Sequence, residues 1–321
     1  MRRLARLNSA VGRWPVLSAA LAATVWLAAM APSVPAARGQ TGGCPPGIAF
    51  CVETQRVVLH VTVVDRQDRF VTDLSQSAFS VVEDDQQQSL TYFAQEDVPV
   101  SIGLVIDNSG SMREKRRHVN AAALEFVKAS NPQDEVFVVN FNDESYIDQD
   151  FTSDIDRLQD ALQRIDTRGG TALYDATSLS LDHLVKAGNK DYNKRALLII
   201  TDGEDTSSRM DLELLVRKLQ SSDVTIYGIG LLSEEERRAA KRAERHLRTI
   251  TRPTGGPAYF PTSFSEVEPL VKRIAADIRN QYILEYNRPQ GKGPGYRRIR
   301  IDLKGGAKSN KVRHRPGYYA D

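Results

Sequence analysis

The stretch Val100–Met112, VSIGLVIDNSGSM, joins an apolar run to an acid and two hydroxyls at alternate positions. The polar residues are Asp107, Ser109 and Ser111, and Gly110 allows a tight turn between the serines. Because a helical pattern follows, we predict that they lie at the carboxyl end of a buried strand, where cation sites are common. Serine and aspartate are also ordinary turn and N-cap residues, so this stretch alone leaves a capping loop as an open alternative.

Two later stretches extend this pattern. Gly169–Ala176, GGTALYDA, places Thr171 at the start of a predicted helix, and Ala196–Asp205, ALLIITDGED, is an apolar strand followed by Asp202. Because the carboxyl ends of neighbouring parallel strands meet at one edge of an open α/β sheet, three loops can bring their oxygens to one point. The candidate metal ligands are Asp107, Ser109, Ser111, Thr171 and Asp202. Five oxygen donors with two charges suit Mg²⁺, which prefers about six oxygens, with Mn²⁺ or Ca²⁺ as alternatives.

Together, DNSGSM, GGTALYDA and TDGED resemble the metal-ion-dependent adhesion site of von Willebrand factor type A domains, over residues 98–283. The chain with its flanks is also similar to bacterial exported proteins described as von Willebrand factor A-related. The resemblance implies a binding module rather than an enzyme, in which an Asp or Glu of a protein partner completes the metal shell. The three hydroxyls would then bind the metal directly, and the two aspartates directly or through water. For the nearby Asp175 and Asp205, we favour capping or hydrogen bonding over a second ion.

Strands and helices alternate along the middle of the chain, which predicts an α/β fold with a doubly wound, mostly parallel, Rossmann-like sheet. β-rich segments flank it, and each has too few apolar residues to form a core alone. We therefore predict that they pair into one small β module. We expect the charged stretch Glu234–Arg248 to be an exposed insertion, with a partner-binding helix as the alternative. We expect the charge run Arg113–His118 to be a solvated face, with a ligand-contact rim near the metal as the alternative. The predicted divisions are a signal peptide (1–36), a linker (37–53), an N-terminal β segment (54–97), the type A domain (98–283) and a C-terminal β segment (284–321).

The first 36 residues have the pattern of a secretion signal. A basic start is followed by an apolar segment, Val16–Ala31, and by small residues at Val34–Ala37. A permanent anchor is the alternative, because Val16–Ala31 is only slightly shorter than a spanning helix. We expect cleavage and export to the periplasm or the exterior, with membrane attachment only through an uncleaved leader. In such an oxidising compartment, Cys44 and Cys51 are expected to form a disulfide.

Charge and motif content bear on the competing functions. The chain has 43 Lys and Arg against 41 Asp and Glu, and without the four leader arginines 39 stand against 41, a net charge of −2. This near neutrality gives no support to nucleic-acid binding. A magnesium-dependent phosphoryl-transfer enzyme is the main competitor, because such sites also use aspartates at strand ends. The sequence has no Walker lysine pattern and no GxSxG elbow, and we predict no catalytic residue. A structural envelope protein with a stabilising metal is the third alternative.

Overall fold

The computed structural model describes residues 56–95, 97–163, 167–190, 192, 194–291 and 293–320. The predicted leader and linker, with both cysteines, lie outside these residues. Thr54–Asp321 form one compact unit. Within the described ranges, no helix is long and apolar enough to cross a membrane.

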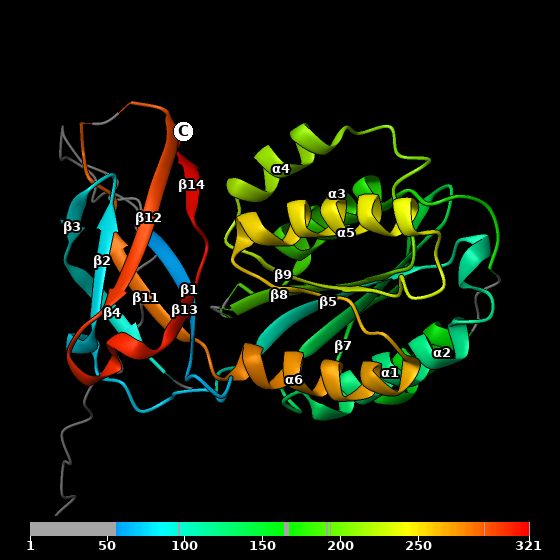
Figure 1. The fold of residues 1–321 in the computed structure, drawn as a ribbon, viewed down its shortest axis with the longest axis horizontal. Helices are drawn as coiled ribbons and strands as arrows, with labels where there is room; N and C mark the ends of the chain where they lie inside the picture. The colour runs from blue at the N-terminus through cyan, green and yellow to red at the C-terminus, as the bar shows by residue number, and fades with distance from the viewer. Residues whose placement is uncertain are drawn as a thin grey trace, which may run out of the picture. The chain divides into compact units, whose positions relative to one another are not determined.

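A six-stranded sheet forms the centre of the fold (Figure 1). Its strand order is β10-β9-β8-β5-β6-β7, and all neighbours are parallel except β7, which is antiparallel to β6. The strands are β5 Val100–Asp107, β6 Glu135–Phe141, β7 Ser145–Thr152, β8 Lys194–Thr201, β9 Thr225–Gly230 and β10 Ala258–Tyr259. Every residue of β5 and β9 is buried, as expected for strands that are covered on both faces.

Helices cover both faces of this sheet, with α1, α2 and α6 on one side and α3, α4 and α5 on the other (Figure 1). The helices are α1 Arg116–Ala129, α2 Ile155–Gln163, α3 Leu173–Ala187, α4 Leu212–Gln220, α5 Arg237–Thr251 and α6 Val267–Arg279. Short 3₁₀ helices span Gln76–Ala78, Gly110–Met112, Arg252–Thr254, Phe264–Glu266 and Gly305–Ser309. Alternation along β5 produces the two layers, because Ile102 and Leu104 pack with α1 and α6 whereas Val105 packs with α3. The predicted α/β fold is confirmed.

The expectation that Glu234–Arg248 is an exposed insertion is wrong. Most of this stretch lies in α5, which is one of the helices that cover the sheet. Its buried residues include Ala243, Leu247 and Ile250, which follow the spacing of one helix face. Many arginines occupy the remaining positions, so a narrow apolar stripe was hidden by the high charge of the segment.

The flanking segments form a β-sandwich of two antiparallel four-stranded sheets, with orders β13-β1-β11-β4 and β14-β12-β2-β3. The strands are β1 Arg56–Val64, β2 Phe79–Glu83, β3 Gln86–Gln88, β4 Leu90–Ala94, β11 Tyr282–Asn287, β12 Gly295–Leu303, β13 Lys311–Arg313 and β14 Gly317–Ala320. N-terminal β1 pairs with C-terminal β11, and β2 pairs with β12. Both sheets contribute to one core, which contains Leu59, Val81, Tyr282 and Ile301. The predicted β-rich module from both flanks is therefore confirmed.

The connection from α6 to the sandwich is short. Only Asn280 and Gln281 separate the end of α6 from the start of β11. Within β11, Ile283 lies opposite Ala94, the last residue of β4. The chain therefore leaves the sandwich and re-enters it on two neighbouring strands, and the predicted division after residue 283 falls inside β11.

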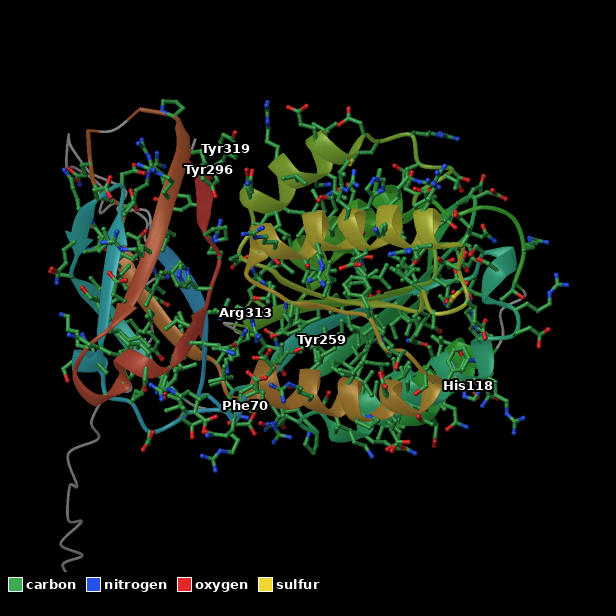
Figure 2. All side chains as sticks on the ribbon, viewed as in Figure 1. Phe70, His118, Tyr259, Tyr296, Arg313 and Tyr319 are labelled. Atoms are coloured by element: carbon green, nitrogen blue, oxygen red, sulfur yellow. The ribbon has the colours of Figure 1, made fainter. Side chains whose placement is uncertain are left out.

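Side chains also join α6 to the sandwich, at a cluster of Thr62, Asp277 and Arg313 that we call the seam. The Asp277 carboxylate is 1% exposed, and it accepts a hydrogen bond from the Thr62 hydroxyl at 2.6 Å. It also pairs with the guanidinium of Arg313, which is labelled in Figure 2 and donates to Thr62 Oγ1 at 3.2 Å. Burial raises the pKa of Asp277, and the charge of Arg313 opposes that shift. The seam thus holds a buried carboxylate of α6 whose partners come from two neighbouring strands of one sheet, β1 and β13.

Candidate metal centre

Three loops meet at the carboxyl edge of the central sheet. The amide of Gly110, in the loop after β5, donates to the carbonyl of Gly169, in the loop before α3, at 3.1 Å. The carbonyl of Thr171 accepts a 2.8 Å hydrogen bond from the amide of Thr206, in the loop after β8. Backbone hydrogen bonds therefore connect the three stretches in which the sequence predicts metal ligands.

Asp107 ends β5 and is fully buried. One of its carboxylate oxygens accepts from the amide of Ser109 at 2.8 Å, and the other accepts from the hydroxyl of Thr201 at 2.6 Å. Burial raises the pKa of Asp107 to about 6, a shift that the charge of Asp202 reinforces and these hydrogen bonds oppose. The carboxylate is thus held by the end of β8 and by its own loop.

The hydroxyls of Ser109 and Ser111 lie 3.2 Å apart, and Ser111 donates to Asp202 Oδ1 at 2.9 Å. The Thr171 hydroxyl oxygen lies 3.9 Å from the position that a Cβ would occupy on Gly203, the residue after Asp202. The structure therefore brings all five predicted site residues to one end of the sheet. Ser111 is exposed whereas the other four are buried, so the cluster opens to solvent on one side.

Gly169 needs to be glycine at this edge. Its φ is +73°, in the left-handed region that glycine adopts without strain. A Cβ on Gly169 would lie 2.0 Å from Asp143 Oδ2, and Asp143 in turn accepts from the amide of Gly170 at 2.7 Å. Because neither glycine has a side chain, the Asp143 carboxylate can lie against the backbone next to Thr171.

Asn108, between the two halves of the first motif, is a structural residue that sequence reasoning missed. Its side-chain amide donates to Asn140 Oδ1 of β6 at 2.5 Å, and Asn140 donates to Asp148 of β7. Its backbone amide donates to the Phe141 carbonyl at 2.7 Å. These bonds fix the motif loop against two strands, and alternation along the sequence carries no signal for them.

Lys115 was also missed, and it corrects the expectation of a wholly solvated charge run over Arg113–His118. Its side chain is 4% exposed, and its ammonium lies 2.6 Å from Asp202 Oδ2 and 3.2 Å from Glu235 Oε1. Burial alone would lower the pKa of Lys115, but the hydrogen bonds and charges of Asp202 and Glu235 raise it above its ordinary value. An ammonium therefore neutralises part of the charge at the site.

Asp175 and Asp205 have the hydrogen-bonding roles that the sequence favoured. Asp205 accepts from the amide of Tyr174 at 3.1 Å and from the hydroxyl of Ser208. Asp175 accepts from the backbone amides of Arg209 and Met210, at 2.9 and 3.0 Å. Both carboxylates thus organise the loop after β8 around the start of α3.

The donor set fits a hard divalent cation. Two carboxylates and three hydroxyls offer oxygen atoms alone, which is the chemistry that Mg²⁺, Mn²⁺ and Ca²⁺ share. Across the part of the chain that the structure describes, no group of three or more His, Cys, Asp or Glu residues is placed to hold a metal. The oxygen chemistry of the hydroxyl-rich cluster makes it a candidate centre, with a low formal charge.

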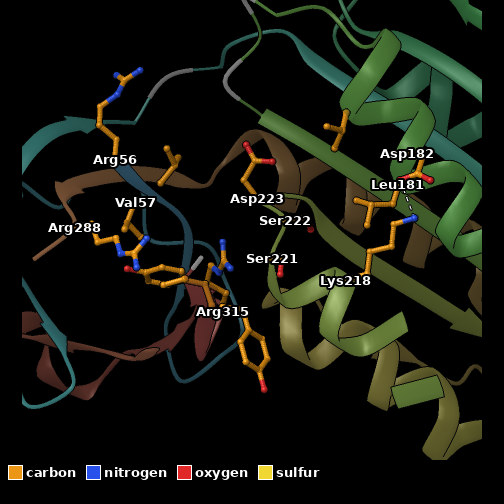
Figure 3. A pocket seen from close by; sticks show the side chains of 15 residues that line it. Arg56, Val57, Leu181, Asp182, Lys218, Ser221, Ser222, Asp223, Arg288 and Arg315 are labelled. Carbon is orange, nitrogen blue, oxygen red and sulfur yellow. Dashed lines mark ion pairs between the residues drawn. The ribbon is translucent and has the colours of Figure 1, made fainter. Parts of the chain in front are cut away.

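A cavity of about 580 Å³ lies elsewhere and includes none of the five predicted site residues (Figure 3). It is lined by the ends of α3 and α4 and by strands of the sandwich. Of its charged residues, Lys218 pairs with Asp182 at 2.8 Å (Figure 3). Arg56 pairs with Glu285 at 3.3 Å. Arg315 donates to the carbonyl of Gln220 at 2.7 Å. Of these contacts, the hydrogen bond from Arg315 to Gln220 is the one that joins the sandwich to the central domain.

The family model of the von Willebrand factor type A domain matches residues 101–273, a range that contains all five predicted site residues. No curated protein matches the chain.

The chain is similar to several solved structures. A von Willebrand factor type A protein from Catenulispora acidiphila is 13% identical, with a TM-score of 0.50, and the match covers 84% of this chain and 75% of that one. The von Willebrand factor domain of the type V pili tip protein Mfa5 from Porphyromonas gingivalis is 12% identical, with a TM-score of 0.47 and coverage of 62% and 99%. The conserved hypothetical protein BatB from Bacteroides thetaiotaomicron is 18% identical, with a TM-score of 0.44 and coverage of 55% and 98%.

Proposed function

Because the chain belongs to the von Willebrand factor type A domain family, we propose that it is an exported binding module that captures a carboxylate of a protein partner through a divalent cation. The observation that carries the proposal is the convergence of two buried carboxylates and three hydroxyls from three loops at one solvent-facing edge. Export rests on the signal-like first 36 residues.

The composition of the donor set supports capture of an acid. Asp107, Ser109, Ser111, Thr171 and Asp202 would hold the cation, with Mg²⁺ the best fit. When bound, the cation would supply two positive charges against the two carboxylates, and the nearby Lys115 ammonium already offsets part of their negative charge. Neutral hydroxyl ligands thus favour an anionic oxygen from outside, and the exposed Ser111 side of the cluster gives that oxygen access.

The surrounding residues have positioning roles in this proposal. Thr201 and the amide of Ser109 orient the Asp107 carboxylate, while the Ser111 hydroxyl orients Asp202. Such supporting hydrogen bonds fix which oxygens face a metal, and their loss weakens metal sites by about 10–100-fold.

Calorimetric titration of the full chain with Mg²⁺ tests the metal. Asp107→Ala is expected to weaken Mg²⁺ binding by at least about 100-fold while the far-ultraviolet circular dichroism stays native. Asp302→Ala, at an exposed position on β12, is the matched control and is expected to bind as the unsubstituted chain does. Equal Mg²⁺ affinity in Asp107→Ala and the unsubstituted chain would refute the metal assignment.

A second experiment tests the acid. A synthetic peptide with one aspartate is titrated into the Mg²⁺-loaded chain, beside the same peptide with asparagine. The proposal expects binding of the aspartate peptide alone and its loss in EDTA. Mg²⁺-dependent hydrolysis of a phosphate ester would favour the enzyme alternative. A rise in melting temperature with Mg²⁺, without carboxylate binding, would favour the structural one.

A further inference from the structure

Asp202 has both of its carboxylate oxygens engaged. Oδ1 accepts from the Ser111 hydroxyl at 2.9 Å, and Oδ2 accepts from the Lys115 ammonium at 2.6 Å. The side chains of Lys115 and Asp202 are 4% and 0% exposed. Removing Lys115 would leave the buried Asp202 carboxylate with an uncompensated charge, which is costly. The candidate centre thus contains a cation supplied by the chain itself.

The same ammonium has a second acceptor. Glu235 Oε1 lies 3.2 Å from Lys115 Nζ, and the Glu235 side chain is 29% exposed. Glu235 belongs to the loop between β9 and α5, and the side chain of the next residue, Glu236, caps α5 by accepting from the amide of Ala239. Lys115 therefore stands between a predicted metal ligand and the start of a helix that covers the sheet.

We propose that Lys115 is an internal counter-cation that competes with the divalent ion for Asp202, and that Glu235 holds the ammonium when the ion is bound. This inference rests on the proposed function. Without metal, the ammonium balances the buried carboxylate. With metal, two cations would face one carboxylate, so the ammonium shifts its interaction towards Glu235. Metal loading is thereby communicated to the β9–α5 loop, and the competition lowers the metal affinity of the site.

Because the Lys115 ammonium and the divalent ion compete for the Asp202 carboxylate, each is expected to weaken the binding of the other. Lys115→Met keeps most of the side-chain length and removes the charge. It is expected to tighten Mg²⁺ binding about tenfold and to lower the melting temperature in EDTA, because Asp202 then lacks its partner. Mg²⁺ is expected to restore that melting temperature.

Glu235→Gln tests the second acceptor. With a weaker acceptor, the ammonium stays on Asp202, so Mg²⁺ binding is expected to weaken about threefold. In the double variant Lys115→Met/Glu235→Gln, the effect of Glu235→Gln is expected to disappear, because no ammonium remains to be held. This double-mutant cycle separates action through Lys115 from direct action on the metal.

Two matched controls isolate the site from general charge effects. Lys128→Met removes a half-exposed lysine of α1 that pairs with Glu125, and Glu234→Gln removes the exposed acid next to Glu235. Both are expected to bind Mg²⁺ within about twofold of the unsubstituted chain.

The readouts are Mg²⁺ affinity by calorimetry and melting temperature in EDTA and in Mg²⁺. If the unsubstituted chain binds Mg²⁺ and Lys115→Met binds it with equal affinity, the ion pair is structural and this inference fails alone. If the effect of Glu235→Gln persists in the double variant, the role of Glu235 as acceptor of the ammonium fails. If neither the unsubstituted chain nor any variant binds Mg²⁺, the proposed function fails with it.

Discussion

Asp202 at the candidate metal centre and Asp277 at the seam are both buried carboxylates, but their partners differ in kind. Asp277 meets the planar guanidinium of Arg313 and the Thr62 hydroxyl, both on strands of the sandwich. Asp202 meets the single ammonium of Lys115, which a second acid shares, and the hydroxyl of the exposed Ser111. A guanidinium offers fixed paired donors, whereas an ammonium is a point charge on a flexible stem. The seam is therefore suited to permanent attachment, whereas the shared ammonium at the centre fits the proposed exchange of one cation for another.

The largest expected effect comes from breaking the seam. Arg313→Met leaves Asp277 buried without its counter-charge, so the free energy of unfolding is expected to fall by about 4 kcal/mol. Urea denaturation measures the loss, and Mg²⁺ is not expected to restore it. Arg300→Met, which breaks an exposed ion pair with Asp302, is the control, and its expected cost is under about 1 kcal/mol. Rescue of Arg313→Met by Mg²⁺ would erase the distinction between the two regions.

The sandwich side is also expected to be sensitive to acid through His60, in β1. Burial lowers the pKa of His60 to about 4, with Lys194, Arg315 and Arg195 adding to the shift and Asp223 opposing it. Neither ring nitrogen has a hydrogen-bond partner among the described residues. The ring is thus neutral in the folded state, while the unfolded chain gains a proton below about pH 6.5.

The contribution of neutral His60 to the free energy of unfolding is therefore fully present above about pH 6.5. It is lost as the pH drops towards 4, by about 3 kcal/mol in total. His60→Leu is expected to remove this part of the acid dependence, measured by urea denaturation between pH 7 and pH 4. His118→Leu, at an exposed position on α1, serves as the control. A parallel pH dependence in His60→Leu and the unsubstituted chain would count against the assignment.

A smaller effect on stability is expected at the edge of the central sheet that carries the candidate metal centre. Gly169→Ala adds a Cβ 2.0 Å from Asp143 Oδ2 at a residue with φ of +73°, so stability is expected to fall by about 1–2 kcal/mol. It also displaces the carbonyl that accepts from Gly110, so Mg²⁺ binding is expected to weaken. Gly291→Ala has a similar φ of +82° with nothing within 4 Å, and it isolates the backbone cost. Equal Mg²⁺ affinity in the two variants would remove the link between the glycine pair and the centre.

Much of the fold follows from local sequence pattern. The apolar runs of β5 and β8 and the stripes of the helices repeat with the periods of buried strands and amphipathic helices. Pairing of the flanks was predictable because neither had enough apolar residues alone. The pattern failed at α5, where Leu247 and Ile250 form a stripe too narrow to stand out among the arginines.

For the candidate site, the sequence predicted which hydroxyl and acidic side chains come together, but not the residues around them. Motif order indicated which hydroxyls and acids would converge, since parallel strands end at one edge. Lys115 and Glu235 gave no signal, because their contact with Asp202 depends on side chains that are far apart in the chain. The seam is similar, since Thr62, Asp277 and Arg313 are far apart in the sequence and meet only where the sandwich contacts the end of α6.

The continuity of α6 with β11 constrains the order in which the chain can acquire its structure. β1 and β2 are made first, yet their neighbours β11 and β12 follow the whole central sheet in sequence. Pairing between strands that are far apart in the sequence is slow to form. Until it forms, the unpaired strand edges promote aggregation. During synthesis β1 and β2 therefore lack these pairing partners until the chain beyond α6 has emerged. Truncation between α6 and β11 would leave β1 and β2 without the strands that they pair with.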